Sequence, residues 1–163
     1  MSPFEERGDS GREPIQILEW VWEDFVRLAR SVDATAELIG RIKEATSARA
    51  KARRIRGQRV LDSIGVRIVV RETAECYRVM LRLHREFSAL VEAYDDYIAT
   101  PKPNGYQSLH TILLTAHRDP IEVQVRTREM HRNAVDGHAA YKRELQQWTA
   151  DRDRSLRRDA RTA

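Results

Sequence analysis

Apolar residues recur at helical spacing in two stretches of the chain. In the first they fall three or four positions apart, which predicts an amphipathic helix that ends near Ser31. These apolar positions are Ile15, Leu18, Trp22, Phe25 and Ala29. A second helix is predicted after Thr73, whose hydroxyl can cap its first turn. Its apolar positions are Cys76, Met80, Leu83 and Phe87.

Runs of β-branched residues predict strands. The stretch LDSIGVRIVV, residues 61–70, is typical of a buried strand. Two more strands, SLHTILLTA and PIEVQVRT, are expected to be joined by a hairpin-like turn through residues 117–120. Because strands and helices are mixed along the chain, the pattern predicts a single α/β domain.

The remaining segments carry weaker signals. Residues 34–41 favour a short strand that runs into a turn at Gly40. The alanines of the basic stretch 41–59 favour a helix, and residues 128–148 are also predicted to be helical.

The domain is expected to cover residues 14–148, between a disordered leader, residues 1–13, and a charged, flexible tail, residues 149–163. The leader lacks a signal-peptide core, and no apolar run approaches the roughly 20 residues that a membrane helix needs. A cytoplasmic protein is therefore expected. The net charge of +4 favours an anionic partner, although solubility alone could explain it. The single cysteine, Cys76, excludes an internal disulfide and a cysteine-based zinc site.

Acids interrupt two of the apolar strands. Asp62 lies at the start of one, and Glu122 lies in the other, where its side chain shares a face with Gln124. Burial of an uncompensated carboxylate is unfavourable, so each acid is expected to have a partner. A shared Mg²⁺ is one such partner, because this ion takes a few carboxylates together with phosphate oxygens. Pairing with nearby arginines is the alternative.

The basic stretch offers cations for a polyphosphate. The groups that could neutralise a triphosphate are Arg41, Lys43, Lys51 and Arg67, with Ser47 as a hydroxyl donor. An arginine can also stack its flat guanidinium on a base. A solvated helix face would explain the same charges.

The segment TPKPNGYQSLH, residues 100–110, combines loop-forming residues with reactive side chains. Gly105 permits close approach of the backbone, and Tyr106 offers a flat face on which a base could stack. The groups that could hold the rest of a nucleotide are Lys102, Asn104 and His110. The alternative is a Pro-Gly turn between strands, with Tyr106 and His110 packed for structural reasons.

Several motifs follow one another along the chain: GRIKEATSARAK, LDSIGVRIVV, DDYIATPKPNGYQSLHT, PIEVQVRT and MHRNAV. In order and spacing they resemble the RelA/SpoT-type alarmone synthetases, and the resemblance covers roughly residues 34–142. It implies a nucleotidyltransferase-like fold, a mixed sheet of about five strands flanked by helices. It also implies Mg²⁺-dependent transfer of the β,γ-pyrophosphate of ATP to the 3′-hydroxyl of GDP or GTP, which makes (p)ppGpp.

The resemblance further implies roles for the donor and metal residues. Arg41 and Arg67 would sandwich the adenine of ATP. The ATP phosphates would be held by Lys43, Ser47 and Lys51. Asp62 and Glu122 would bind Mg²⁺, and Glu122 would activate the acceptor hydroxyl.

On the acceptor side, the resemblance implies that Tyr106 stacks on the guanine. The rest of the acceptor would be fixed by Lys102, Asn104 and His110. Gln124 and Arg126 match the strand motif, and Gln124 is placed with the acceptor. Just before the loop, residues 93–96 read AYDD, which is nearer the acidic family pattern that goes with a preference for GDP.

Other functions stay open at this point. A toxin-like relative would pyrophosphorylate the 3′ end of tRNA, although intact Tyr106 and Asn104 argue against it. The residues that would receive RNA phosphates are Arg49, Arg53, Arg54, Arg56 and Arg59. A variant that uses an adenine nucleotide as acceptor is a further alternative. A catalytically silent nucleotide-binding regulator is another, and the intact Asp62 and Glu122 count against it. Relatives of this kind often assemble through terminal helices, so a homo-oligomer, dimer or tetramer, is a further hypothesis.

Overall fold

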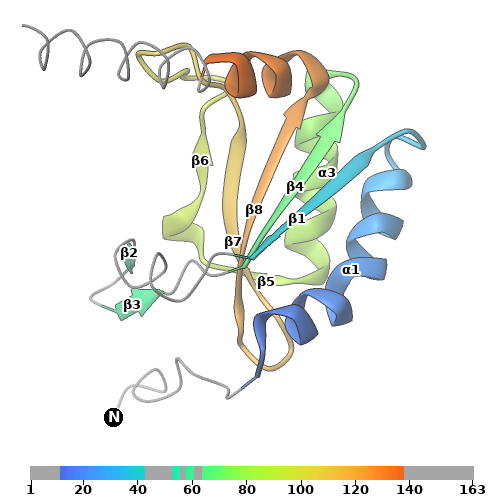
Figure 1. The fold of residues 1–163 in the computed structure, drawn as a ribbon, viewed down its shortest axis with the longest axis vertical. Helices are drawn as coiled ribbons and strands as arrows, with labels where there is room; N and C mark the ends of the chain where they lie inside the picture. The colour runs from blue at the N-terminus through green and yellow to red at the C-terminus, as the bar shows by residue number, and fades with distance from the viewer. Residues whose placement is uncertain (1–11, 43–52, 56–57, 61–63, 138–163) are drawn as a thin grey trace, which may run out of the picture.

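A six-stranded mixed sheet forms the centre of the fold, in the order β1-β4-β8-β7-β5, with β6 paired to β7 (Figure 1). The computed structural model describes residues 12–42, 53–55, 58–60 and 64–137. The strands of this sheet are β1 (Glu37–Ile42), β4 (Ile64–Val70), β5 (Ser88–Ala89), β6 (Asp95–Asp96), β7 (Leu109–Leu114) and β8 (Pro120–Thr127). β4 and β8 run parallel, and the other pairs are antiparallel. The predicted single domain, with a mixed sheet flanked by helices, is confirmed.

Helices α1 (Pro14–Arg30) and α3 (Thr73–Glu86) pack against the same face of this sheet (Figure 1). Phe25 of α1 and Leu83 of α3 are fully buried in a core that includes Ile68 and Val123 of the central strands. Val66, Ile68 and Val70 alternate with the residues of β4 that point the other way, as the two-residue period of a strand requires. The core therefore lies between the helices and one face of the sheet.

The predicted first helix is confirmed, with Pro14 at its first position and Ser31 as its C-cap. Its buried face is rotated from the predicted one. Ile15 is 50% exposed, whereas Val21 and Leu28 are buried. The core side of α1 is therefore centred on the line through Val21 and Leu28.

The start of α3 differs from the prediction. Glu72, not Thr73, is the N-cap residue, and Thr73 is the first residue of the helix. The carboxylate of Glu75 accepts hydrogen bonds from the backbone N–H groups of Arg71 at 3.1 Å and Glu72 at 2.9 Å. The capping function thus comes from an acid inside the first turn, where negative charge is favoured by the helix dipole.

The predicted turn at Gly40 is wrong, because β1 runs straight through this residue. Gly40 pairs with Val66 of β4. A Cβ at position 40 would lie 2.9 Å from Cδ2 of Leu18 and 3.2 Å from Cζ3 of Trp22. Glycine is needed here so that α1 can approach the strand closely.

The helix predicted over residues 41–59 is also wrong for the part of it that the structure describes. Residues 41 and 42 belong to β1, and β2 (Arg53–Ile55) and β3 (Gln58–Val60) form an antiparallel pair. Alanine content is a weak local preference that strand pairing overrides. The rest of the segment lies outside the described residues.

The hairpin between β7 and β8 is confirmed. The backbone N–H of Thr115 donates to the carbonyl of Asp119 at 3.0 Å, and that of Arg118 donates to the carbonyl of Thr115 at 2.8 Å. A further helix follows β8 over residues 128–137, the described part of the helix predicted over residues 128–148. Within the described ranges, no helix has the length and apolarity to cross a membrane. The predicted leader, apart from residues 12 and 13, and the predicted tail lie outside those ranges.

Candidate nucleotide site

The predicted polar residues of β4, β7 and β8 lie on the sheet face opposite α1 and α3, here called the site face. Because paired residues share a face, the register places Arg67, Gln124 and His110 in one row across β4, β8 and β7. Asp95 extends this row on β6. The next row, on the same face, contains Arg41, Gly65, Glu122 and Ile112.

A chain of polar contacts links the loop to the acid of β8. The hydroxyl of Tyr106 lies 2.8 Å from Nε2 of His110. On the other side of the ring, Nδ1 of His110 lies 3.9 Å from Oε1 of Glu122. The side chains of His110 and Glu122 are 7% and 13% exposed, so these contacts are largely shielded from water. The structure thus brings together Tyr106 and His110 of one sequence motif and Glu122 of another.

The loop that carries Tyr106 is closed by its own hydrogen bonds. The N–H of Gly105 donates to the carbonyl of Lys102 at 2.8 Å, and the N–H of Lys102 donates to the carbonyl of Tyr106 at 3.1 Å. Oδ1 of Asn104 accepts from the N–H of Tyr106 at 3.1 Å. Gly105 has a φ of 79°, a conformation that favours glycine. Asn104 therefore shapes the loop, besides the role with the acceptor that the sequence predicts.

Aromatic rings and a lysine cluster around Tyr106. The Nζ of Lys102 lies 4.5 Å from the ring centre of Tyr97 and 5.4 Å from that of Tyr106. The ring of Tyr97 meets those of Tyr106 and His110 edge to face, at 6.3 Å and 5.2 Å. Tyr97 is a site residue that the sequence analysis missed, because nothing in its spacing distinguishes it from a packing residue.

Asp96 fixes the first part of the same loop. Its Oδ1 accepts from the N–H groups of Ile98 at 3.0 Å and Ala99 at 2.8 Å, and the hydroxyl of Tyr77 donates to Oδ2 at 2.9 Å. Burial and, to a smaller extent, the carboxylate of Asp96 raise the pKa of Tyr77 to about 12. Asp96 thus anchors the loop to α3, while Asp95 is the acid that joins the row of His110.

Guanidinium groups lie on the site face beside these residues. Nε of Arg67 donates to Oε1 of Gln124 at 3.3 Å. Two positions beyond Gln124, Arg126 is 2% exposed, and its Nη2 lies 2.8 Å from Nδ1 of His131. Burial and the charge of Arg67 lower the pKa of Arg126. The alternation of Glu122, Gln124 and Arg126 along β8 is the sequence signal for this group.

The donor side of the site is described in part. Arg41 is exposed and lies in the row of Glu122. The predicted residues outside the described ranges are Lys43, Ser47, Lys51 and Asp62. Among the described residues, no group of three or more His, Cys, Asp and Glu side chains could hold a metal ion. Glu122 is the described member of the predicted metal pair, and one or two carboxylates with substrate phosphates are a donor set that suits Mg²⁺.

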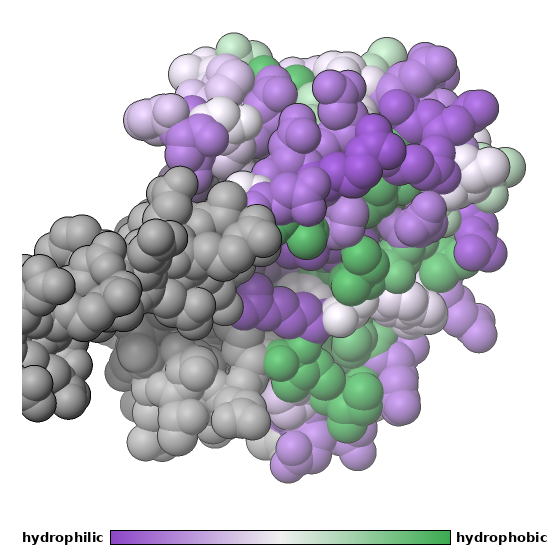
Figure 2. All heavy atoms as spheres, turned by 45° about the horizontal axis from the view of Figure 1, so that its top comes forward, coloured by the Kyte–Doolittle hydropathy of each residue, from purple (hydrophilic) through white to green (hydrophobic). Residues whose placement is uncertain are grey.

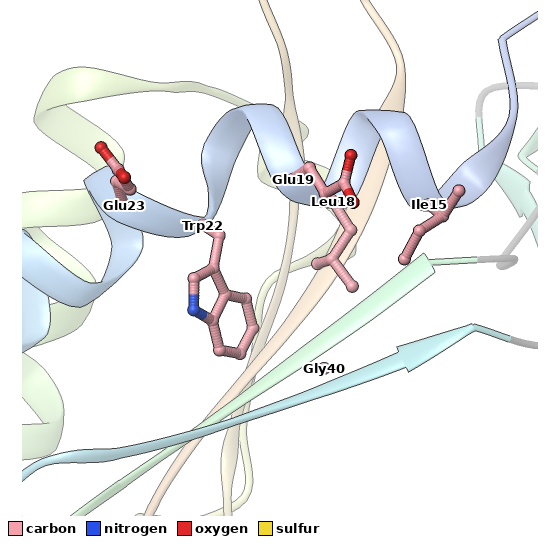
Figure 3. A pocket seen from close by; sticks show the side chains of 6 residues that line it. All are labelled: Ile15, Leu18, Glu19, Trp22, Glu23 and Gly40. Atoms are coloured by element: carbon pink, nitrogen blue, oxygen red, sulfur yellow. The ribbon is translucent and has the colours of Figure 1, made fainter.

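A separate groove lies on the other side of the sheet, between α1 and β1 (Figure 3). Its lining residues are Ile15, Leu18, Glu19, Trp22, Glu23 and Gly40. It contains none of the predicted site residues. Figure 2 shows that apolar side chains form separate patches on a surface that is otherwise mostly hydrophilic. The groove is therefore a surface feature distinct from the candidate site.

A mixed sheet that presents a carboxylate, guanidinium groups and aromatic rings on one face is typical of domains that bind nucleotides. The family model described as "Region found in RelA / SpoT proteins" matches residues 40–146. The chain belongs to this family. The GTP pyrophosphokinase of Photobacterium angustum is 36% identical over 121 residues, which are 73% of this chain and 16% of that protein. The chain thus spans a small part of the curated relatives it matches.

Solved structures agree with this assignment. The small alarmone synthetase 2 from Bacillus subtilis superposes with a TM-score of 0.64 and 27% identity, covering 82% of this chain and 78% of the other. The small alarmone synthetase 1 from the same organism, bound to its product pppGpp, gives a TM-score of 0.59 and 26% identity. That match covers 80% of this chain and 78% of the other. The fold is therefore that of small alarmone synthetases.

Proposed function

We propose that the chain transfers the β,γ-pyrophosphate of ATP to the 3′-hydroxyl of GDP or GTP, making (p)ppGpp. The observation that carries the proposal is the arrangement of Tyr106, His110 and Glu122, which places a carboxylate next to a loop suited to a guanine base. The GTP pyrophosphokinases and alarmone synthetases among the relatives support the same reaction.

In this mechanism the 3′-hydroxyl oxygen attacks the β-phosphorus of ATP. The bond between that phosphorus and the bridging oxygen of the α-phosphate breaks, and AMP leaves. Glu122 accepts the proton of the attacking hydroxyl, with His110 beside it. Such transfers ask a protein mainly for positioning and charge neutralisation.

The two substrates would be held by two sets of residues. Arg41 and Arg67 would sandwich the adenine, and the ATP phosphates would meet Lys43, Ser47 and Lys51. The acceptor would stack on Tyr106, and its other contacts would come from Lys102, Asn104, His110 and Gln124. Asp62 and Glu122 would hold Mg²⁺, which would supply charge neutralisation at the phosphates when bound.

GDP is expected to be the preferred acceptor. Asp95 lies beside His110 at the end of the site-face row. Its negative charge would disfavour the additional phosphate of GTP near this end of the row. A cytoplasmic location and assembly into a dimer or tetramer stay predictions, and light scattering of the purified chain would measure the latter.

The test incubates the purified chain with Mg²⁺ and ATP labelled at the γ-phosphate. GDP, GTP, AMP or bulk tRNA is offered separately, and the products are resolved by chromatography. Label is expected on GDP and GTP, and Glu122→Gln is expected to lower the rate at least about hundredfold, because a positioned base contributes that much. Label only on tRNA would identify a toxin-like relative, and no transfer at all would favour a silent binder.

Glu86→Gln is the matched control. This carboxylate lies at the end of α3, on the other side of the sheet, where it accepts a hydrogen bond of 2.7 Å from Arg27. It is expected to leave the rate unchanged. Asp62→Ala completes the set, and full turnover in both Asp62→Ala and Glu122→Gln would refute the metal assignment.

A further inference from the structure

Arg126 is a buried cation to which the proposed mechanism gives no role. It is 2% exposed, and charged side chains at that depth usually pair with a carboxylate. Among the residues that the structure describes, Arg126 forms no ion pair, and its buried Nε has no hydrogen-bond partner. In the described part of the chain, a carboxylate partner therefore does not account for this charge.

The contacts that Arg126 does make are with an imidazole and an aromatic ring. Its Nη2 lies 2.8 Å from Nδ1 of His131, and its Cζ lies 5.9 Å from the ring centre of Tyr106. A guanidinium has donors only, so Nδ1 of His131 must accept, and the proton of the neutral ring must sit on Nε2. The contact therefore requires His131 to be uncharged.

The charges around His131 keep it in that state. Burial lowers its pKa, and Arg126 of β8 and Arg67 of β4 lower it further, against an opposite effect of Glu37 of β1. Protonation of His131 would remove the acceptor and place a second cation directly against Arg126. The bond between Arg126 and His131 is thus a contact that acid breaks.

We propose that Arg126 is a positioning residue for the acceptor nucleotide: it supports the ring of Tyr106 from inside the protein, and neutral His131 holds it there. The inference rests on the proposed function, because Tyr106 is the residue on which the guanine would stack. A buried cation without a carboxylate lowers stability, and a charged group in such surroundings is a candidate for a role at a functional site rather than in the fold.

The first test is Arg126→Met, which keeps an unbranched side chain and removes the charge. The Kd for GDP is expected to rise about three- to thirtyfold, as for the loss of a desolvated cation–π contact, while the KM for ATP changes less than about twofold. The melting temperature is expected to stay constant or rise, because an uncompensated charge has gone. A lower melting temperature with an unchanged Kd for GDP would show that Arg126 is structural.

The second test is His131→Asn, which places an amide oxygen where Nδ1 accepts and which cannot be protonated. In the wild type the Kd for GDP is expected to rise as the pH falls below about 6.5, the ordinary pKa of histidine. In His131→Asn the Kd for GDP at about pH 7.5 is expected to be near that of the wild type. This Kd is not expected to rise as the pH falls. Identical pH profiles in the two proteins would overturn the inference, even if Arg126→Met fails to fold.

A third measurement separates this inference from the proposed function. Titration of the His131 ring by NMR, in the wild type and in Arg126→Met, needs no activity. The pKa of His131 is expected to rise when the neighbouring charge is removed, and an unchanged pKa would show that the two side chains do not interact. A wild type that neither transfers label nor binds GDP would refute the proposed function. An active wild type with an unaltered Arg126→Met would refute this inference alone.

Discussion

At the scale of single residues, the candidate site depends on contacts between side chains from different motifs. Tyr106 illustrates this, because its ring lies near the charge of Arg126 from the β8 motif, while Lys102 and His110 of its own motif contact the ring and the hydroxyl. The ring and the hydroxyl of Tyr106 therefore have separate roles. One offers a surface for a base, and the other sets the orientation of a histidine.

Substitutions of Tyr106 can distinguish the role of the ring from that of the hydroxyl. Tyr106→Ala is expected to raise the Kd for GDP about fivefold to 150-fold, because base stacking on an aromatic ring contributes about 1–3 kcal/mol. Tyr106→Phe keeps the ring and should retain most of the affinity, while it slows transfer through the loss of the hydroxyl contact with His110. Calorimetry and steady-state kinetics measure the two effects. Wild-type GDP binding by Tyr106→Ala would contradict the stacking role.

At the scale of elements, the strength of the periodic signal decided what the sequence could predict. α1 and α3 have clear helical periods, β7 and β8 contain β-branched residues typical of strands, and all four elements were predicted. Gly40 was assigned to a turn, since a glycine in a turn and a glycine beneath a helix look the same in sequence. The glycine at position 40 is explained by its close contact with Leu18 and Trp22, which belong to another element, α1. Likewise, Thr73 was the better local cap, but the Glu75 carboxylate satisfies the backbone groups at that helix start.

The candidate site was predictable to a similar degree. The alternation of Glu122, Gln124 and Arg126 on β8 indicated which side chains share a face, because the period of a strand is fixed. Tyr97 and the bond between Arg126 and His131 could not be found in this way. They depend on how a loop and a helix pack against the sheet, which no local pattern encodes.

Packing of α1 on β1 can be tested at Gly40. Gly40→Ala is expected to destabilise the fold by about 1–3 kcal/mol, because its Cβ would lie 2.9 Å from Cδ2 of Leu18 in a closely packed contact. Gly137→Ala is the matched control, since a Cβ there meets no atom within 4 Å. Urea denaturation of both variants measures the difference. Equal midpoints would mean that α1 shifts without loss of packing.

At the scale of the whole molecule, a half-buried histidine joins the helical layer to the sheet. Nε2 of His84, on α3, lies 2.8 Å from Oγ1 of Thr111, on β7. Burial lowers the pKa of His84 below its ordinary value of 6.5. A group with a lowered pKa of this kind stabilises the fold while it is neutral, and that stability is lost as the pH falls through the folded-state pKa.

The free energy of unfolding is therefore expected to fall as the pH is lowered from about 7 to values below the ordinary histidine pKa of about 6.5. His84→Gln should reduce this dependence, because it removes the titrating group. His117→Gln, at an exposed position of the β7–β8 hairpin, serves as the control. Urea denaturation across this pH range makes the measurement. A wild-type stability that stays constant across the range would contradict the prediction.

β4 and β8 are neighbours in the sheet, but α3 and β5 to β7 separate them along the chain. The hairpin of β7 and β8 joins nearby residues and can form early, whereas β4 can join β8 only after the whole intervening chain has closed. Arg67 and Gln124 therefore meet late in folding. A nascent chain whose β8 has not yet emerged from the ribosome cannot present this row. A nucleotide that binds the row would favour the finished sheet by mass action.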